Sequence, residues 1–400
     1  MTHRLLWSTG ALATTVALLI LAWRLGDGAP GDATLTTPWG DPDLQGIWTD
    51  EFRTPLQRHA RYGGREFMTD AEFAELEEQR REAIGRDFRP PSGTEADVAG
   101  AYNALFDLGP KRISKRTSLI IDPPDGRIPP RTPEAQRRSA LVREYTLAIL
   151  AETDACRNRD ALKKQFGNAS CDGGTYSPNV PRRDEPIPYY NVSFLNRAHG
   201  PEDRSIAERC MGGQLPDFGG FRRVVQAPGF VAISYDVGQG QGWQRVVPAN
   251  GGPHLPASIQ LWFGDSRGRW EGKTLVIDVT NFSGKTDFHG AREHLHLVER
   301  WTRTAPNTLE YMVTIDDPTT WTKPWTVKQE MTRQNEQENR IYMDPRCHEG
   351  NYGLTGMLSG ARAAEEAFAA GRGPDPASID LYSTSIYFRR HDDDQFVFVE

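Results

Sequence analysis

Two histidines lie one residue apart in the stretch REHLHLVERW, and a glutamate follows three positions after the second. Alternate residues of a β-strand share a face, which places His294, His296 and Arg300 on one side and Glu299 on the other. Acid–base catalysis needs one proton carrier beside a pocket, so His296 is the first candidate, with Arg300 to stabilise charge. We expect this histidine face to point into a barrel. Glu299 takes the catalytic role if the faces are reversed.

A metal site is the competing interpretation of the same histidines. His294 and His296, together with His289 or His348, are residue types that bind iron, copper or zinc. Glu299 cannot converge on one metal with His296 from a regular strand, because the two residues lie on opposite faces. We therefore expect no cofactor, and a metal-dependent enzyme stays an alternative.

Further polar residues extend the candidate site. Asp278 lies between apolar neighbours in the stretch TLVIDVTNF, where an unpaired charge would be costly. Pairing with Arg300 across neighbouring strands would satisfy it, either as a structural ion pair or as part of a ligand site. The predicted ligand contacts from strands and loops are Tyr311, His294, Asp287, His289, His348, Glu349 and Tyr352.

Several functional classes are disfavoured by what the chain lacks. No G-x-S-x-G motif occurs, DSRGRWEGKT does not have the spacing of a phosphate loop, and GQGQGW is not followed by a predicted helix. The net charge of −7 comes without a basic stripe, so we expect no nucleic acid partner. The hydrophobic content of 38% and the charged content of 25% are typical of a folded globular protein.

The N-terminus indicates export. A basic start precedes an apolar run from Leu5 to Trp23, and small and polar residues follow. The run is long enough for a short membrane span, so residues 1–30 are either a signal peptide or an N-terminal membrane anchor. We expect a periplasmic or secreted protein, which an uncleaved segment would hold at the inner membrane.

Export into an oxidising compartment favours disulfides over thiols. Of the three possible pairings, the simplest joins Cys156 to Cys171 and Cys210 to Cys347. The second bond would make the RCHEGNYG loop rigid.

The hydrophobic pattern predicts a mainly β protein. From residue 206 onward, short alternating runs are separated by turns, as in an antiparallel meander. We expect a lipocalin-like antiparallel barrel, or a strongly curved meander, over residues 206–400, with a C-terminal helix. Residues 31–205 would contribute the first strand or strands and a helical, loop-rich insertion. In this insertion, Thr69 with Glu72 predicts a helix start, and a second helix begins at Thr132 and Pro133. The second helix has a predicted buried face made of Leu141, Tyr145, Leu147, Ala148 and Ile149.

Several long pieces resemble a large family of uncharacterised exported bacterial proteins: WGDPDLQGIWT, GDSRGRWEGKTLVIDVTNFSGKTDFHG, LHLVERWTRT and CHEGNYGLTG. The resemblance implies export but carries no established reaction. This chain departs from the family pattern at FGGFRRVV and at REHLHL, where a pocket is expected.

Together these features favour an exported protein that encloses an apolar or aromatic small molecule in its barrel. An enzyme version is cofactor-free proton transfer of the isomerase, hydratase or lyase type. The alternatives are a ligand-binding module without activity and the metal-dependent enzyme.

Overall fold

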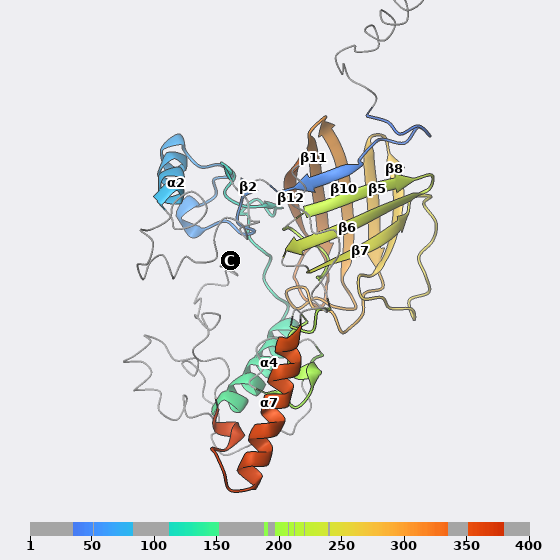
Figure 1. The fold of residues 1–400 in the computed structure, drawn as a ribbon. Helices are drawn as coiled ribbons and strands as arrows, with labels where there is room; N and C mark the ends of the chain where they lie inside the picture. Colours follow the sequence, from blue (N-terminus) through green and yellow to red (C-terminus); the bar gives the residue numbers. More distant parts are fainter. Residues whose placement is uncertain are drawn as a thin grey trace, which may run out of the picture. The chain divides into compact units, whose positions relative to one another are not determined.

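The structure is a computed structural model. It describes residues 35–50, 52–82, 112–151, 188–190, 197–206, 208–211, 213–219, 221–238, 241–334 and 351–379. The chain divides into two compact units, residues 1–43 and 44–400. In the first unit, Thr36 and Pro42 form an isolated β-bridge around a tight turn. The helices and strands named below belong to the second unit (Figure 1).

Nine strands form an antiparallel sheet that curves into a nearly closed barrel (Figure 1). They are β1 (Gly46–Thr49), β5 (Phe221–Ala227), β6 (Phe230–Gly238), β7 (Gln241–Pro248), β8 (Asp265–Glu271), β9 (Thr274–Thr280), β10 (His296–Ala305), β11 (Thr308–Asp316) and β12 (Trp325–Arg333). Their spatial order is β7-β6-β5-β1-β12-β11-β10-β9-β8. The predicted antiparallel barrel, with its first strand from the N-terminal third, is confirmed.

Three short strands lie outside this path. β4 (Ile120–Asp122) pairs with β12, while β2 (Phe52–Arg53) and β3 (Arg112–Ile113) form a separate parallel pair.

The barrel has a seam between β7 and β8, and the odd number of strands explains it. Direction alternates along the path, so the strands at its two ends run the same way. Strands of equal direction cannot be joined by a hairpin, and the chain crosses between them through residues 249–264. The seam is nevertheless closely packed. A Cβ atom on Gly268 would lie 3.0 Å from Val247 Cγ1, and the N–H of Gly251 donates to the carbonyl of Gly268.

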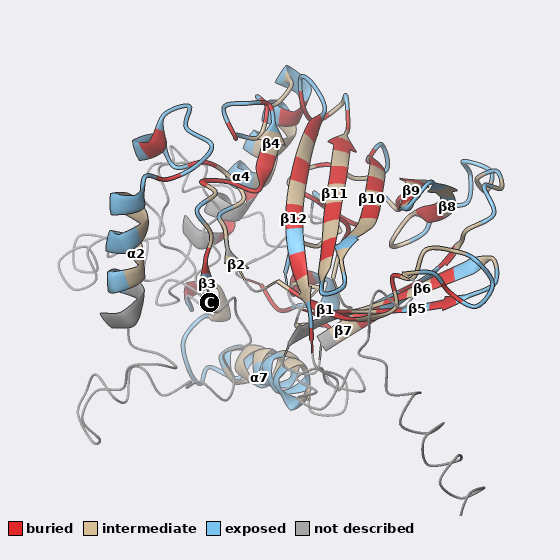
Figure 2. Cartoon of the chain, turned by 90° about the horizontal axis from the view of Figure 1, so that it is seen from above, coloured by how far each residue is buried: buried red, intermediate tan, exposed pale blue. Residues whose placement is uncertain are grey.

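Burial alternates along the strands, as the period of two predicted, and Figure 2 shows the alternating bands on β10, β11 and β12. The inward side chains form one large core. Its members include Trp48, Leu297, Trp301, Val313, Trp325 and Val327, none of them more than 1% exposed. The interior of the barrel is therefore filled by side chains, as in other small barrels.

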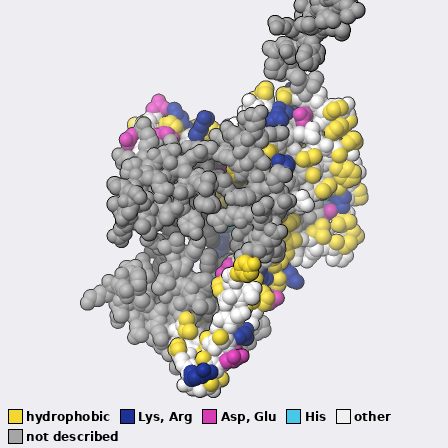
Figure 3. All heavy atoms as spheres, viewed as in Figure 1, with side chains coloured by type: hydrophobic (Ala, Val, Ile, Leu, Met, Phe, Trp, Pro, Cys, Tyr) yellow, Lys and Arg dark blue, Asp and Glu magenta, His cyan; other side chains and the backbone are white. Residues whose placement is uncertain are grey.

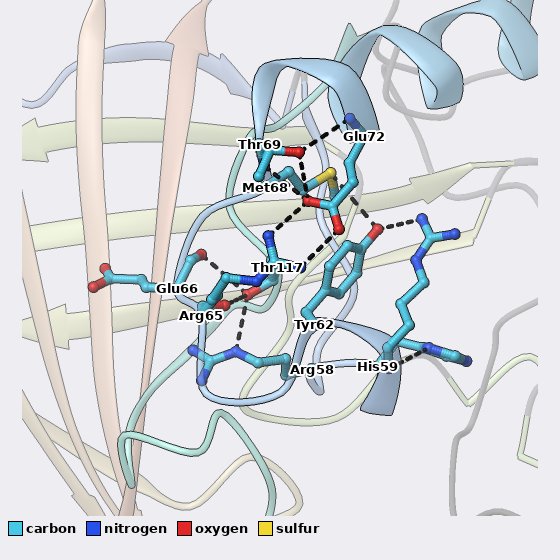
Figure 4. A network of polar contacts seen from close by, with 10 residues as sticks. Arg58, His59, Tyr62, Arg65, Glu66, Met68, Thr69, Glu72 and Thr117 are labelled. Carbon is cyan, nitrogen blue, oxygen red and sulfur yellow. Dashed lines mark hydrogen bonds and ion pairs between the residues drawn. The ribbon is translucent and has the colours of Figure 1, made fainter.

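Helix α2 (Asp70–Glu82) begins with the predicted capping box (Figure 4). The N–H of Glu72 donates to Thr69 Oγ1 (3.2 Å), and the N–H of Thr69 donates to the Glu72 carboxylate (2.8 Å). Hydrogen bonds from the Arg65 guanidinium and from Thr69 lower the pKa of Glu72 to about 2. Nearby, Arg58 Nε donates to Thr117 Oγ1, which donates to the carbonyl of Arg65. These contacts fix the segment that precedes α2. This segment includes the 3₁₀ turn η1 (Ala60–Tyr62).

Helix α4 (Pro133–Ala151) also begins where the sequence predicted. The N–H of Ala135 donates to Thr132 Oγ1 (3.1 Å), so Thr132 is the N-cap. Of the predicted buried face, Tyr145 and Ile149 are buried. Leu141 is 56% exposed, so that part of the prediction is wrong. The structure does not describe the side chains of Leu147 and Ala148.

Helix α7 (Tyr352–Ala369) is the predicted C-terminal helix, with Asn351 as its N-cap. Arg362 on this helix donates to the carbonyls of Ala198 and His199, beside the 3₁₀ turn η2 (Pro201–Asp203). A further 3₁₀ turn, η4 (Pro376–Ser378), follows. Among the described residues, no helix combines the length and the apolar character that a membrane span requires.

Two predictions fall largely outside the described residues. The predicted signal peptide or anchor, residues 1–30, is one of them. Cys210 is disulfide-bonded, but Cys156, Cys171 and Cys347 are not described. The two pairings therefore stay predictions.

Candidate functional site

A buried polar group lies inside the barrel, and we call it the interior polar cluster: Tyr235, Arg245, Ser266, Glu299 and Tyr311. Arg245 Nη2 donates to Glu299 Oε2, and the hydroxyl of Tyr311 donates to Glu299 Oε1 (2.9 Å). Arg245 also donates to the hydroxyl of Tyr235 (2.8 Å) and to Ser266 Oγ (3.2 Å). Four strands, β6, β7, β10 and β11, and the start of β8 supply these side chains. The cluster therefore ties the two sides of the seam together.

Burial and charge determine the protonation of this cluster. Burial, and then the neighbouring charge of Glu299, raise the pKa of Tyr311 well above its ordinary value. Burial likewise raises the pKa of Tyr235. Burial alone would lower the pKa of Arg245, but the charge and hydrogen bond of Glu299, together with Tyr235 and Tyr311, more than offset this and leave it raised. At neutral pH both tyrosines are neutral and Arg245 is a cation.

The prediction that the histidine face of β10 points inward is wrong. Glu299 is 0% exposed, together with Leu297, whereas the side chains of His296 and Arg300 are 41% and 37% exposed. Leu297 and Trp301 have the same parity as Glu299, and their burial selects the inward face. The carboxylate of Glu299 lies on the same inward face as Leu297 and Trp301, and its burial is tolerated because it pairs with Arg245.

On the outer face, His296 belongs to a chain of alternating histidines and aspartates. His296 Nε2 lies 3.1 Å from Asp278 Oδ2, and His254 Nε2 lies 2.8 Å from Asp278 Oδ1. His254 Nδ1 lies 2.8 Å from Asp265 Oδ2. The predicted pairing of Asp278 with Arg300 is wrong, since Arg300 contacts Glu271 instead.

This outer chain holds the crossover that spans the seam. His254 comes from residues 249–264, whereas Asp265 and Asp278 lie on β8 and β9. The N–H of Leu255 also donates to Asp265, and the amide of Asn281 donates to the carbonyl of Leu255 (3.0 Å). Hydrogen bonds to Leu255, His254 and Arg267 outweigh the effect of burial and lower the pKa of Asp265. We interpret this chain first as a structural clamp.

The remaining predicted contacts are not brought together. Asp287 accepts from Arg292 Nε (2.9 Å) and from the N–H of Gly290. Burial lowers the pKa of His289 to about 4, and its ring meets Phe288 edge-on. The side chain of His294 is 60% exposed.

At the other predicted loop, Tyr352 is exposed at the start of α7. His348 and Glu349 lie outside the described residues. No group of three or more histidine, cysteine, aspartate or glutamate side chains within the described part of the chain has the arrangement of a metal site.

A second feature is the segment of residues 213–219, which we call the strap. Arg222 donates to the carbonyls of Asp217 and Gly219, and Gln329 Nε2 donates to the carbonyl of Phe218 (2.7 Å). A Cβ atom on Gly213 would lie 2.5 Å from Trp243 Nε1, so the strap backbone lies directly against this indole. The strap thus contacts inward residues of β5, β7 and β12.

Several buried polar atoms around the strap have no hydrogen-bond partner in the described structure. They are Trp243 Nε1, Trp325 Nε1, Arg222 Nε, Gln329 Oε1 and Asp217 Oδ2. Two more buried atoms lack a hydrogen-bond partner in the described structure: Arg245 Nε in the interior polar cluster, and Trp301 Nε1 beside it. Each such atom costs about 1–3 kcal/mol when nothing pairs with it. A native fold usually fills such positions with water or with a ligand atom.

Aromatic rings are packed beside these atoms. The rings of Tyr235, Trp243 and Phe263 are stacked with centroid separations of 3.9 and 4.0 Å. Phe288 meets Phe218 edge-on at 6.2 Å and is stacked on Trp325 at 6.1 Å. This end of the barrel, which we call the strap end, therefore combines flat apolar surfaces with polar atoms that lack partners.

The sequence interpretation missed Arg245, Gln329 and the strap. A signal for Arg245 was present, because it has the same parity as Trp243 and Val247 in WQRVVP and so shares their inward face. Gln329 likewise shares the parity of Val327 and Met331 on β12. Their partners, from β10 and from the strap, had no local signal.

An exposed apolar surface covers the outside of β5, β6 and β7, where Figure 3 shows hydrophobic side chains gathered. Val225 and Val246 both pair in register with Ala232, and Val246 is 63% exposed. Phe230 lies one row further along and is 49% exposed. The described residues show nothing that covers this surface.

A scan against protein-family models gave no match, and a search of curated proteins gave none either.

Proposed function

We propose that this protein binds an apolar or aromatic small molecule at the strap end of its barrel, and that it does so after export to the periplasm or beyond. The observation that carries the proposal is the group of buried polar atoms without partners around the strap, set beside stacked aromatic rings. A ligand with both apolar and polar parts would satisfy these atoms and stack against the rings.

Binding is better supported than catalysis at this end of the barrel. Both carboxylate oxygens of Glu299 already accept hydrogen bonds, one from Tyr311 and one from Arg245. Its side chain is fully buried. A general base must reach the proton that it abstracts, and Glu299 is enclosed by its partners. The interior polar cluster therefore positions strands and ligand contacts.

Proton transfer on the outer face is the second candidate. The exposed ring of His296 is oriented by Asp278, and a carboxylate that orients an imidazole is a common arrangement in acid–base catalysis. A reaction here would not involve a ligand inside the barrel, because His296 lies on the opposite face of β10. Loss of turnover in His296→Ala with full ligand binding would favour this candidate.

Diphenylhexatriene, a neutral apolar fluorophore that brightens when bound, tests the binding proposal. We expect saturable binding, and we expect Phe218→Trp to weaken it about tenfold because the larger ring fills the strap end. Phe230→Trp makes the same change on the outer face and should leave binding unchanged.

Two outcomes count against the proposal. Absence of saturable binding, together with absence of a co-purified ligand in native mass spectrometry, would refute it. Equal effects of the two variants would place the binding site elsewhere.

A further inference from the structure

We infer that the strap is an internal stand-in for the ligand, and that the ligand is a neutral aromatic carbonyl compound. This inference rests on the proposed function and adds the chemical class of the ligand. The strap presents two groups to the barrel at once, an aromatic ring and backbone carbonyl oxygens. A small molecule that takes the place of the strap would therefore present the same two groups, an aromatic ring and a carbonyl oxygen.

The ring is that of Phe218. It meets Phe288 edge-on, and Phe288 is stacked on Trp325, so the strap adds a phenyl ring to a cluster of aromatic side chains. Phe218 is only half-buried, whereas Leu215 in the same strap is 2% exposed and belongs to the core. An incoming ring can therefore replace Phe218 while Leu215 continues to anchor the strap.

The carbonyl groups are bound by strong donors. The amide of Gln329 donates to the carbonyl of Phe218, and the guanidinium of Arg222 donates to those of Asp217 and Gly219. The second hydrogen-bond acceptor of the Gln329 amide is Asp50 Oδ2 (2.7 Å). Because both acceptors contact Nε2, the orientation of the amide is determined, and a carbonyl oxygen is the group that suits this position.

Atoms without partners point to the same class. The N–H groups of Trp243 and Trp325 lack acceptors, and the strap backbone lies against the first of them without supplying one. The strap thus satisfies only part of the available donors. A ligand with one or more carbonyl oxygens can satisfy more of them, which gives it an advantage over the strap.

Charge excludes an ionic ligand. Arg222 already pairs with Asp217 at 3.2 Å, and Asp50 adds a second carboxylate next to the Gln329 amide. A buried anion would have no counter-ion here, because Arg222 is already paired, and it would be costly to desolvate. A cation would lie near the guanidinium of Arg222 and could not accept from the N–H donors of Gln329 and Trp243. The ligand is therefore neutral.

Three probes test the inference by isothermal titration calorimetry. Benzophenone has two phenyl rings and a carbonyl, diphenylmethane has the same rings without the carbonyl, and benzoylbenzoate adds a carboxylate. We expect benzophenone to bind about tenfold more tightly than diphenylmethane, because it satisfies donors that diphenylmethane cannot. Benzoylbenzoate should bind more weakly than benzophenone.

Two variants separate the strap from the donors. Phe218→Ala removes the competing ring and should strengthen benzophenone binding about tenfold, since more of the protein is then competent to bind. Phe230→Ala on the outer face should change nothing. Gln329→Leu removes the donor and should lower the affinity for benzophenone to that for diphenylmethane. Gln244→Leu, on the exposed face of β7, should leave the affinity for benzophenone unchanged.

The outcomes distinguish this inference from the proposed function. Equal affinity for benzophenone and diphenylmethane, with diphenylhexatriene still bound, would overturn the inference and leave the binding proposal standing. Weaker benzophenone binding by a folded Phe218→Ala protein would show that Phe218 is part of the site and not a stand-in for the ligand. Failure of every probe, diphenylhexatriene included, would refute both.

Discussion

Replacing Glu299 by leucine should be among the most destabilising single changes in the barrel. Glu299 is the carboxylate that faces Arg245, and both side chains are buried, at 0% and 6% exposure. The substitution leaves the guanidinium of Arg245 with two neutral acceptors, Tyr235 and Ser266. The hydroxyl of Tyr311 loses its acceptor at the same time.

The expected magnitude follows from burial of the pair. Removal of one partner of a buried ion pair typically costs about 3–5 kcal/mol, because the other charge stays desolvated and uncompensated. Removal of both partners costs much less, so Glu299→Leu combined with Arg245→Met should lie within about 2 kcal/mol of the wild type. The two substitutions are therefore not additive.

Urea unfolding at neutral pH, followed by tryptophan fluorescence and circular dichroism, measures these free energies. A double-mutant cycle with the two single variants and the double variant should give a coupling of at least about 4 kcal/mol, because each single cost is at least about 3 kcal/mol and the double cost is at most about 2 kcal/mol. Glu271→Leu is the matched control, because Glu271 pairs with Arg269 and Arg300 on the surface and should hardly affect stability. A Glu299→Leu protein as stable as the wild type, or additive single effects, would refute the reasoning.

Three further predictions concern the core, a buried histidine and the disulfide. Leu297→Ala should lower the free energy of unfolding by about 2–5 kcal/mol in urea, and a cost below about 1 kcal/mol would contradict its position in a packed core. The pKa of His289 is lowered to about 4 from 6.5, so only the unfolded chain gains a proton at this site near pH 5, and stability should fall by about 2 kcal/mol from pH 7 to 5. His289→Asn should remove this part of the pH dependence and the exposed His294→Asn should not, and equal pH profiles would refute the assignment. Nonreducing peptide mapping should join Cys210 to Cys347, and recovery of Cys210 with another cysteine would show the predicted pairing to be wrong.

Local sequence patterns were sufficient to predict most of the barrel strands and the starts of two helices. The alternation of apolar residues from β5 to β12 predicted strands of the right type, and it also predicted that His296 and Glu299 lie on opposite faces of β10. The capping box at Thr69 and the proline after Thr132 located two helix starts. These signals act between residues at most four positions apart, so they can be read without knowledge of the fold.

The direction in which a strand faces is decided differently. In β10, one face has His296 and Arg300 and the other has Glu299 among apolar residues, and the local pattern allowed either to be inside. The choice depends on Arg245, which lies on β7, far away in sequence and across the seam. A buried carboxylate is tolerated only where a counter-ion and hydrogen-bond donors meet it.

The sequence by itself determined the class of the protein: an antiparallel barrel whose helices begin at recognisable caps. Only the tertiary structure decided which charges lie within it, because nine alternating strands leave β7 and β8 running in the same direction, and closing that seam brings Arg245 to Glu299. Only the tertiary structure placed Phe218 against Phe288 and its carbonyl against Gln329. Contacts between residues so far apart in the chain depend on how the barrel closes, and a short run of residues carries no record of that closure.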